Sequence, residues 1–117
     1  MKYMLIHAID PNAGHVTDGM PSFDSWLDEM LARGVTLNGD RLRDVSDATT
    51  VQVRDREVLV SDGPFAETKE LIAGYDVIEC ADLDEAIEIA AKHPTAWQGS
   101  IEVRPILAER CGTPEAG

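Results

Sequence analysis

The residues best suited to chemistry in this chain are a histidine near its start and a short acidic stretch in its middle. His7 lies within an apolar run, and Asp62 opens the nine-residue stretch DGPFAETKE. The ordinary pKa of histidine lies near neutrality, so His7 is the best available general base, with Asp62 as its orienter or acid. The alternatives are structural. A histidine inside an apolar strand is commonly a core residue, and Asp-Gly between strands is a common hairpin signal.

The rest of DGPFAETKE supplies further candidate binding residues. Phe65, Glu67 and Lys69 follow Asp62 in a loop that a proline stiffens, and we expect them to line the mouth of a pocket. Carboxylates on a stiff loop suit acid–base work because their geometry is set in advance. For Lys69 and Glu70 the alternative is a solvated ion pair, which contributes little to stability.

The remaining histidines give weaker signals. His93 lies at the expected end of a helix, where a capping cation is its simplest role. His15 shares a loop with Asp10 and Asp18, but the spacing of the three fits no known metal-ligand pattern. We therefore predict no metal site. The sequence also lacks a phosphate-binding glycine loop and a CxxC pair, so we predict no cofactor.

Hydrophobic periodicity indicates the elements that must position these residues. The sequence predicts strands over residues 3–9, 35–42, 49–54, 58–60, 72–80 and 100–106. It predicts one helix between an N-cap at Ser22 and Gly34, and a second that begins at Asp82. The order β-α-β-β-α-β with an extra central hairpin is typical of a ferredoxin-like α+β fold. We expect one domain over 1–106 and a polar tail over 107–117.

Two helices can cover only one side of such a sheet, so its faces should differ. We expect the helices to cover Val35, Leu37, Val51, Val53, Ile78, Cys80, Ile101 and Val103. The opposite face then carries Thr36, Asn38, Asp40, Thr50, Gln52, Arg54, Tyr75, Val77, Glu79, Glu102 and Arg104. This polar face either lies open to water, as antiparallel sheets commonly do, or lines a wet cavity that a second copy of the chain closes.

Some binding candidates depend on this choice. Both registers of the first strand are partly apolar, so the face of His7 stays open; if its apolar neighbours meet the helices, His7 joins the polar face. Tyr75 and Arg104 are binding candidates on that face, Arg104 as a clamp for a substrate anion. The alternative that we favour is structural: Arg104 and Glu102 pair across the sheet.

The chain is strongly acidic, since 22 acidic residues against 10 basic ones give a formal net charge of -12. This charge repels phosphate backbones and anionic membrane surfaces, so we expect neither nucleic acid nor a membrane as a partner. No run approaches the ~20 apolar residues of a membrane span, and the N-terminus lacks the apolar region of a signal peptide. We expect Cys80 and Cys111 as reduced thiols and place the protein in the cytoplasm.

Several motifs resemble the DGPF-type branch of the YCII-related family. They are DGPFAETKE, Gly74-Tyr75, the helix with Leu83, Glu85 and Ala86, His93-Pro94 and the closing EVRP of residues 102–105. The resemblance covers nearly the whole chain. It implies a ferredoxin-like fold and a homodimer of the dimeric α/β-barrel kind, with sheets face to face around a pocket. That implication favours the closed cavity over the open polar face.

The activity of the family does not transfer directly. Its founding branch is suspected to be enzymatic, with a His–Asp pair in a cleft. One related member is a dehydrochlorinase acting on a chlorinated hydroquinone, and some DGPF-type proteins are associated with extracytoplasmic-function sigma factors. The founding branch carries its histidine near the start of the first helix, where residues 21–26 have none, and His93 stands in place of its aspartate. The pair therefore cannot be carried over.

Two functions follow as hypotheses. The first is a small dimeric enzyme without a cofactor, which binds a small organic molecule in a polar pocket. It would use His7 and Asp62 for a lyase- or isomerase-like acid–base step, with Arg104 or Lys69 as anion clamp. The second is a non-catalytic ligand-binding or regulatory module, linked to a sigma-factor-type transcription regulator. The enzyme requires His7 within hydrogen-bond reach of a carboxylate inside an accessible cavity.

Overall fold

The computed structural model describes residues 1–10, 18–63 and 71–107. Within them the chain is an α+β protein whose strands are Lys2–Ile9 (β1), Thr36–Arg41 (β2), Thr49–Arg54 (β3), Glu57–Asp62 (β4), Leu71–Glu79 (β5) and Gly99–Pro105 (β6). Its helices are Phe23–Arg33 (α1), Leu83–Ala91 (α2) and the short Pro94–Gln98 (α3), and a 3-10 turn spans Val45–Asp47 (η1). The sequence predicts all of these elements except α3 and η1.

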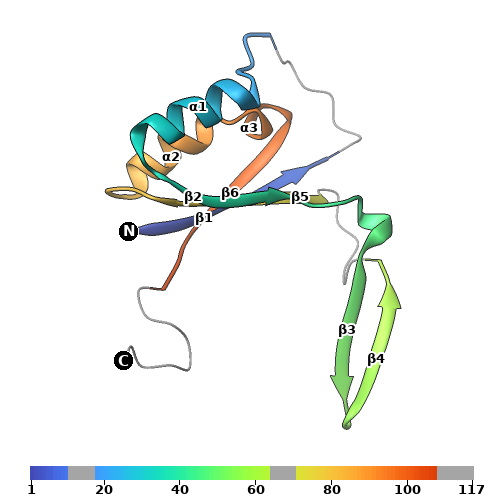
Figure 1. Ribbon diagram of the computed structural model, residues 1–117. Helices are drawn as coiled ribbons and strands as arrows, with labels where there is room; N and C mark the ends of the chain where they lie inside the picture. The colour runs from blue at the N-terminus through green and yellow to red at the C-terminus, as the bar shows by residue number, and fades with distance from the viewer. Residues whose placement is uncertain (11–17, 64–70, 108–117) are drawn as a thin grey trace.

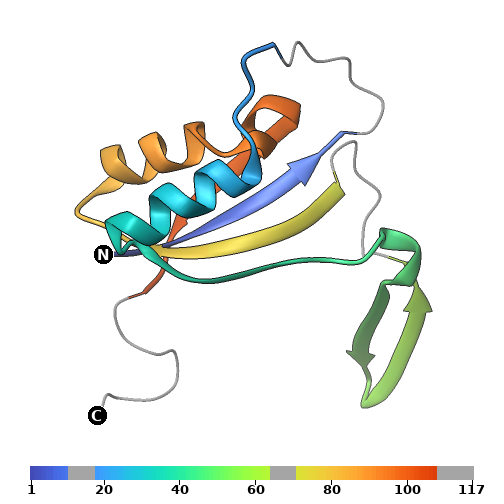
Figure 2. The ribbon, with the colours of Figure 1, turned by 45° about the horizontal axis from the view of Figure 1, so that its top comes forward.

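One antiparallel sheet forms the body of the fold. Its strands follow the order β2-β5-β1-β6, whereas β3 and β4 form a separate two-stranded sheet. α1 and α2 lie side by side over one face of the larger sheet, with α3 beyond the end of α2 (Figure 1, Figure 2). This arrangement is compatible with the ferredoxin-like fold. The dimeric barrel stays a prediction.

Both long helices begin where the sequence predicts. The Ser22 side chain accepts a hydrogen bond from the backbone N–H of Ser25 at 3.1 Å, and the Asp82 side chain accepts one from Glu85 at 2.9 Å. These bonds satisfy backbone donors that the first turn of a helix leaves unpaired. Gly34 follows α1 with a φ of 71°, which glycine adopts without steric cost.

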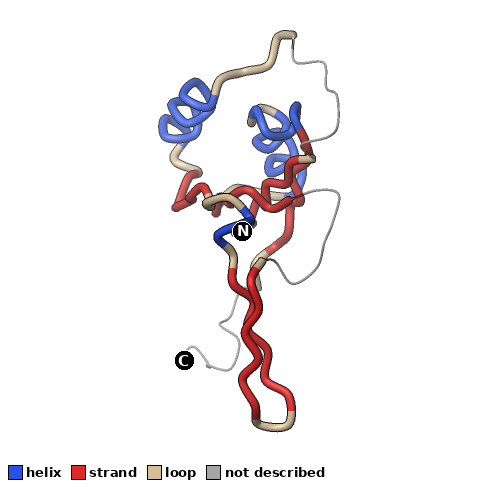
Figure 3. Tube along the Cα trace, turned by 90° about the vertical axis from the view of Figure 1, so that its right-hand side faces the viewer, coloured by secondary structure: helices blue, strands red, loops and turns tan. Residues whose placement is uncertain are grey.

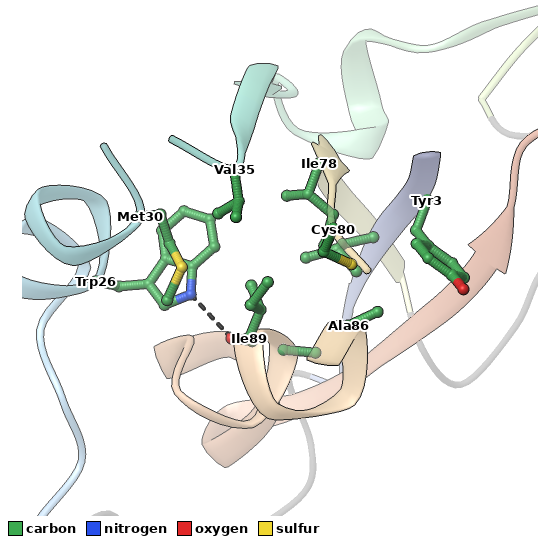
Figure 4. Packing of buried hydrophobic residues seen from close by; sticks show 10 residues of the cluster. Tyr3, Trp26, Met30, Val35, Ile78, Cys80, Ala86 and Ile89 are labelled. Carbon is green, nitrogen blue, oxygen red and sulfur yellow. Dashed lines mark hydrogen bonds between the residues drawn. The ribbon is translucent and has the colours of Figure 1, made fainter. Parts of the chain in front are cut away.

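The hydrophobic core lies between the helices and the covered face of the sheet (Figure 4). Trp26 and Met30 of α1, Ile89 of α2 and Ile78 of β5 are each at most 2 % exposed there. The indole Nε1 of Trp26 donates a hydrogen bond to the backbone carbonyl of Ile89 at 3.0 Å, which ties α1 to α2. Trp26 is therefore both a core residue and a link between the two helices.

The first strand presents His7 to the helices. Tyr3, Leu5 and His7 are buried along one face of β1, whereas Met4 and Ile6 on the other face are only partly buried. Register decides this outcome, because a shift of one residue exchanges the two faces of a strand. His7 consequently lies beside the core and not on the polar face.

The hairpin of β3 and β4, called the arm below, departs from the prediction. Val51 and Val53 do not face the helices; they are 60 % and 57 % exposed. They oppose Val60 and Val58 in register, so four exposed valines share one face of the arm. The arm leaves the sheet on the side away from the helices (Figure 1, Figure 3). Periodicity reveals an apolar strand face, but not the surface that this face meets.

β2 carries a second departure. A register shift between Thr36 and Asn38 places Thr36 opposite Ile78, on the helix-covered face, and Leu37 is 45 % exposed. The prediction that Leu37 packs under the helices while Thr36 faces away is therefore wrong. Irregularities of this kind interrupt the alternation on which the prediction rests.

Other predictions for the covered face hold. Ile78 and Cys80 are buried in the core, and Ile101 and Val103 pack against it. Cys80 is a free thiol, while Cys111 lies outside the described residues, as does most of the predicted tail. The described helices include none that is long and apolar enough to span a membrane.

Candidate active site

Three titratable side chains from three parts of the chain meet under the helices. Nε2 of His7 in β1 lies 2.7 Å from Oδ2 of Asp76 in β5. Nε2 of His93, before α3, lies 3.9 Å from the same oxygen, and the two imidazole centroids are 4.3 Å apart. The side chains of His7, Asp76 and His93 are only 7, 13 and 8 % exposed. Groups buried this deeply need polar partners, and His7 and Asp76 provide one for each other.

Strand register brings His7 and Asp76 together. His7 opposes Gly74 across the β1–β5 pair, and Asp76 follows two residues later on the same face of β5. Diagonal neighbours of this kind lie within reach of each other's side chains. The β1–β5 register shifts immediately after His7, and such irregularities are over-represented next to active sites.

A glycine makes room for the carboxylate. Gly39 of β2 opposes Asp76, and a Cβ at Gly39 would lie 2.1 Å from Asp76 Oδ1 and 2.8 Å from the backbone oxygen of Tyr75. A larger residue would displace the carboxylate. Gly39 therefore lets Asp76 reach over the neighbouring strand, with Oδ2 on His7 and Oδ1 above the glycine.

His93 is held as a neutral ring. It is the N-cap of α3, where its Nδ1 accepts a hydrogen bond from the backbone N–H of Thr95 at 3.0 Å. Burial, and secondarily the neighbouring His7, lowers the pKa of His93 from 6.5 to about 4 against the opposing effect of Asp76. The prediction of a cation that caps a helix end is therefore wrong, because His93 caps the start of α3 as an uncharged acceptor.

Aromatic rings fix the orientation of His93. Trp26 meets it edge-on with centroids 4.7 Å apart, and Phe23 does so at 5.8 Å. His7 packs against it at a tilt of 36°. Edge-to-face contacts of this kind favour one ring orientation, so the polar atoms of His93 keep fixed directions.

The contacts of His7 favour one tautomer. Its Nδ1 is buried and has no hydrogen-bond partner within the described part of the chain. A proton on Nδ1 would be a buried donor without an acceptor, at a cost of about 1–3 kcal/mol. The ring proton therefore belongs on Nε2, which donates to Asp76 Oδ2 and holds the carboxylate.

The cluster lines a cavity of about 690 Å³. Ile9, Phe23, Leu42 and Pro94 contribute apolar surface, and Asp40, Arg41 and Tyr75 add polar groups. A cavity of this size, in which apolar surface and polar groups lie side by side, suits a small polar organic ligand.

The spacing of the cluster also suits a metal ion, because one ligand atom from each of the three residues lies within 4.8 Å of the others. The hydrogen bonds argue against that role. An imidazole nitrogen must be unprotonated to bind a metal, but the Thr95 N–H occupies His93 Nδ1 and leaves the ring proton on Nε2. His7 and Asp76 alone fall short of the three protein ligands that catalytic zinc sites use.

One of the two predicted catalytic residues lies in this cavity. His7 lines it, and the carboxylate that His7 contacts is Asp76. Asp62 is an exposed residue at the end of β4, opposite Thr49 in the arm. The aspartate beside His7 is thus a different one from the aspartate that the sequence predicts.

The predicted binding residues have separate locations. Tyr75 lines the cavity, and its hydroxyl lies 3.4 Å from Asp40 Oδ2. Arg104 is exposed and forms an ion pair with Glu102. This is the structural role that the sequence favours, but the pair lies within β6 and does not cross the sheet. Phe65, Glu67 and Lys69 lie outside the described residues, and so does His15.

Asp76 is absent from the site residues that the sequence predicts, and His93 has a different role from the predicted one. Asp76 lies two residues before Ile78 in a predicted strand, and side chains two residues apart point to the same face. Because Ile78 is expected to face the helices, the carboxylate of Asp76 falls on the covered face as well. A carboxylate in such a position is rarely left buried without a purpose. His93-Pro94 matches the N-cap and first position of a helix, where proline is over-represented.

Comparison with known proteins finds a matching family model and a similar protein. A family model described as YCII-related domain matches residues 1–110. An uncharacterised protein of Rhizobium meliloti (strain 1021) is 43 % identical over 74 residues, which make up 62 % of this chain. The match spans 60 % of the length of that relative. Neither description names a reaction.

Proposed function

We propose that this chain, which belongs to the YCII-related family, is a small enzyme that moves a proton on a small organic molecule in an isomerase- or lyase-like step. The observation that carries the proposal is the carboxylate of Asp76, which His7 holds at 2.7 Å beside a cavity of about 690 Å³. A carboxylate positioned in this way suits a general base because its geometry is set before the substrate binds.

Asp76 is the member of the pair that meets the substrate. Its side chain is 13 % exposed against 7 % for His7, and its Oδ1 lies over Gly39, which lines the cavity. His7 Nδ1, by contrast, is sealed from solvent. His7 therefore positions the carboxylate, so the roles of base and orienter are exchanged relative to the prediction from sequence.

Groups of the chain itself are sufficient for such a step. Proton transfer needs a base, a route for the proton's return and a site that limits water, and no redox or group-transfer cofactor takes part. Arg41 lines the cavity and forms no ion pair within the described residues, so we assign it the anion-clamp role in place of Arg104. Tyr75 keeps its assignment as a binding residue of the cavity wall.

We also propose that the protein is a DGPF-type homodimer of the dimeric α/β-barrel kind. The arm supports this assembly, because its four valines are 57–65 % exposed on one face. A two-stranded hairpin alone is marginally stable in water, so a partner surface should cover it. A second copy could cover both the valine face and the uncovered face of the sheet.

Exchange of carbon-bound protons tests the proposed enzyme before its substrate is identified. The protein is incubated in D2O with a panel of small ketones and aldehydes, and the loss of their α-proton signals is followed by 1H NMR. We expect faster exchange of at least one compound, and a fall of about 100-fold in Asp76→Asn. Glu102→Gln changes an exposed side chain of β6, so it is the matched control and should retain full activity.

The same experiment separates the second function. A panel compound that raises the melting temperature of the wild type without faster exchange would favour the second function, a non-catalytic ligand-binding or regulatory module linked to a sigma-factor-type regulator. Equal exchange by the wild type and Asp76→Asn would show that another group is the base.

A further inference from the structure

We propose that His93 is a neutral hydrogen-bond donor that binds the substrate oxygen on which negative charge develops. The substrate is then a small carbonyl compound with an acidic C–H bond next to the carbonyl group. The inference rests on the proposed function of Asp76 as base. It depends on three features of His93: its tautomer, its unused donor and its position beside the carboxylate.

The backbone determines which nitrogen of His93 carries the proton. A backbone N–H can only donate, so the 3.0 Å bond from Thr95 requires a lone pair on His93 Nδ1. A neutral ring then has its proton on Nε2, the nitrogen on the side of Asp76. Because the bond from Thr95 is part of the first turn of α3, the fold itself maintains this tautomer.

The Nε2–H of His93 has no partner inside the described part of the protein. Asp76 Oδ2 lies 3.9 Å away, beyond hydrogen-bond distance. Trp26, Phe23 and His7 pack against the ring and keep its direction constant. A donor that is held in place and still unpaired suits a ligand oxygen, since no reorganisation is needed when charge develops.

One small molecule can meet both groups. In a carbonyl compound the oxygen and the α-hydrogen are three bonds apart, so one small molecule can reach both His93 Nε2 and the Asp76 carboxylate, whose Oδ2 lies 3.9 Å from that nitrogen. The carbonyl oxygen can therefore accept from His93 while the α-hydrogen points at the carboxylate. Both residues line the same cavity, which gives such a molecule room to bind.

The reaction balances within these groups. Asp76 takes the α-proton, the C–H electron pair forms a C=C bond, and the carbonyl π pair moves onto the oxygen as an enolate. His93 stabilises that oxygen by a hydrogen bond and keeps its own proton, as a neutral imidazole does best. Return of the proton to another position gives an isomer, whereas expulsion of a group from the β-carbon gives an elimination product. Burial keeps the pKa of His93 at about 4, so the ring is uncharged at neutral pH.

NMR of the labelled full-length protein observes His93 directly. We expect 15N spectra to show its ring as the uncharged Nε2–H tautomer between pH 6 and pH 8. 4-Nitrophenolate at pH 8 serves as the probe, because its oxygen then carries negative charge and its ring is small enough for the cavity. Saturation with the probe should shift the His93 Nε2–H signals. The dissociation constant should rise about tenfold in His93→Asn, which retains an N-cap oxygen for α3. Glu102→Gln should bind the probe like the wild type.

The outcomes separate the two claims. A His93 ring that is charged at pH 6, or that carries its proton on Nδ1, would overturn the inference, and so would equal probe affinity in the wild type and His93→Asn. The expected His93 signals without exchange of any carbon acid would remove the proposed enzymatic function. They would still support His93 as the oxyanion-binding group of a ligand-binding protein.

Discussion

Replacing His93 by asparagine should flatten the dependence of stability on pH between about pH 7 and pH 5. Burial lowers the pKa of His93 from 6.5 to about 4, so in this range the unfolded chain takes up a proton that the folded chain does not. The unfolded state then binds more protons, and the free energy of unfolding rises with pH. This contribution is complete above pH 6.5 and is lost as the pH falls towards 4.

The two pKa values of His93 set the size of the effect. A change from 6.5 to about 4 corresponds to about 3 kcal/mol over the whole window, of which about 2 kcal/mol falls between pH 7 and pH 5. The side chain is only 8 % exposed, which limits screening by solvent. Surface carboxylates act mainly at lower pH: hydrogen bonds from Lys92 and Ala81 lower the pKa values of Glu29 and Glu85 from 4.5.

Urea unfolding at a series of pH values measures the effect. The free energy of unfolding of the wild type minus that of His93→Asn should rise by about 2 kcal/mol from pH 5 to pH 7. The difference cancels groups that the substitution leaves unchanged, and asparagine keeps the N-cap of α3. A difference that stays constant with pH would refute the reasoning, because His93 would then titrate alike in the folded and unfolded chains.

Three further predictions concern the site, the core and the arm. Gly39→Ala should lower the rate of carbon-acid exchange about tenfold, because the new Cβ would lie 2.1 Å from Asp76 Oδ1 and displace the carboxylate. Asn38→Ala on the same strand should keep the wild-type rate, and equal rates in the two variants would contradict this geometry. Trp26→Phe should cost about 1–3 kcal/mol in urea unfolding, because it leaves a cavity in the core and removes the indole hydrogen bond to the Ile89 carbonyl, which then keeps the bond from the Lys92 N–H. A loss under about 0.5 kcal/mol would argue against this packing. Sedimentation at micromolar concentration should give twice the chain mass for the wild type and one chain mass for Val53→Lys, while a lysine on the polar face of the arm should leave the dimer intact. A monomeric wild type would refute the proposed homodimer.

Local chemistry is what the sequence predicts best. The N-cap side chains of Ser22 and Asp82 and the left-handed Gly34 act within one helical turn, so their residue types alone locate the ends of α1 and the start of α2. The alternation of Val51 and Val53 likewise predicts β3 correctly. Each of these signals depends on interactions between residues close in sequence.

The position of the arm depends on contacts with residues that are distant in sequence or belong to another molecule, and a local sequence pattern does not reveal such contacts. Val51 and Val53 alternate as a buried strand would, yet the larger sheet consists of β2, β5, β1 and β6. The same pattern fits a strand under the helices and a strand that a second molecule covers. Pattern alone therefore identifies the valine face, while the surface that it meets follows only from tertiary or quaternary structure.

The candidate site shows a different limit, because its informative polar residue lies on the covered face of the sheet and not on the polar face. The polar face of the sheet has many charged groups, but charged groups in contact with water are common on antiparallel sheets and do not by themselves indicate a site. A carboxylate on the covered face does need one, since it must be paired to remain buried. Asp76 meets this requirement through His7, and the small Gly39 opposite it leaves the space that the pairing requires. Alternation within β5 was enough to put Asp76 on that face, whereas its partner depended on the register of β1, which an apolar strand does not reveal.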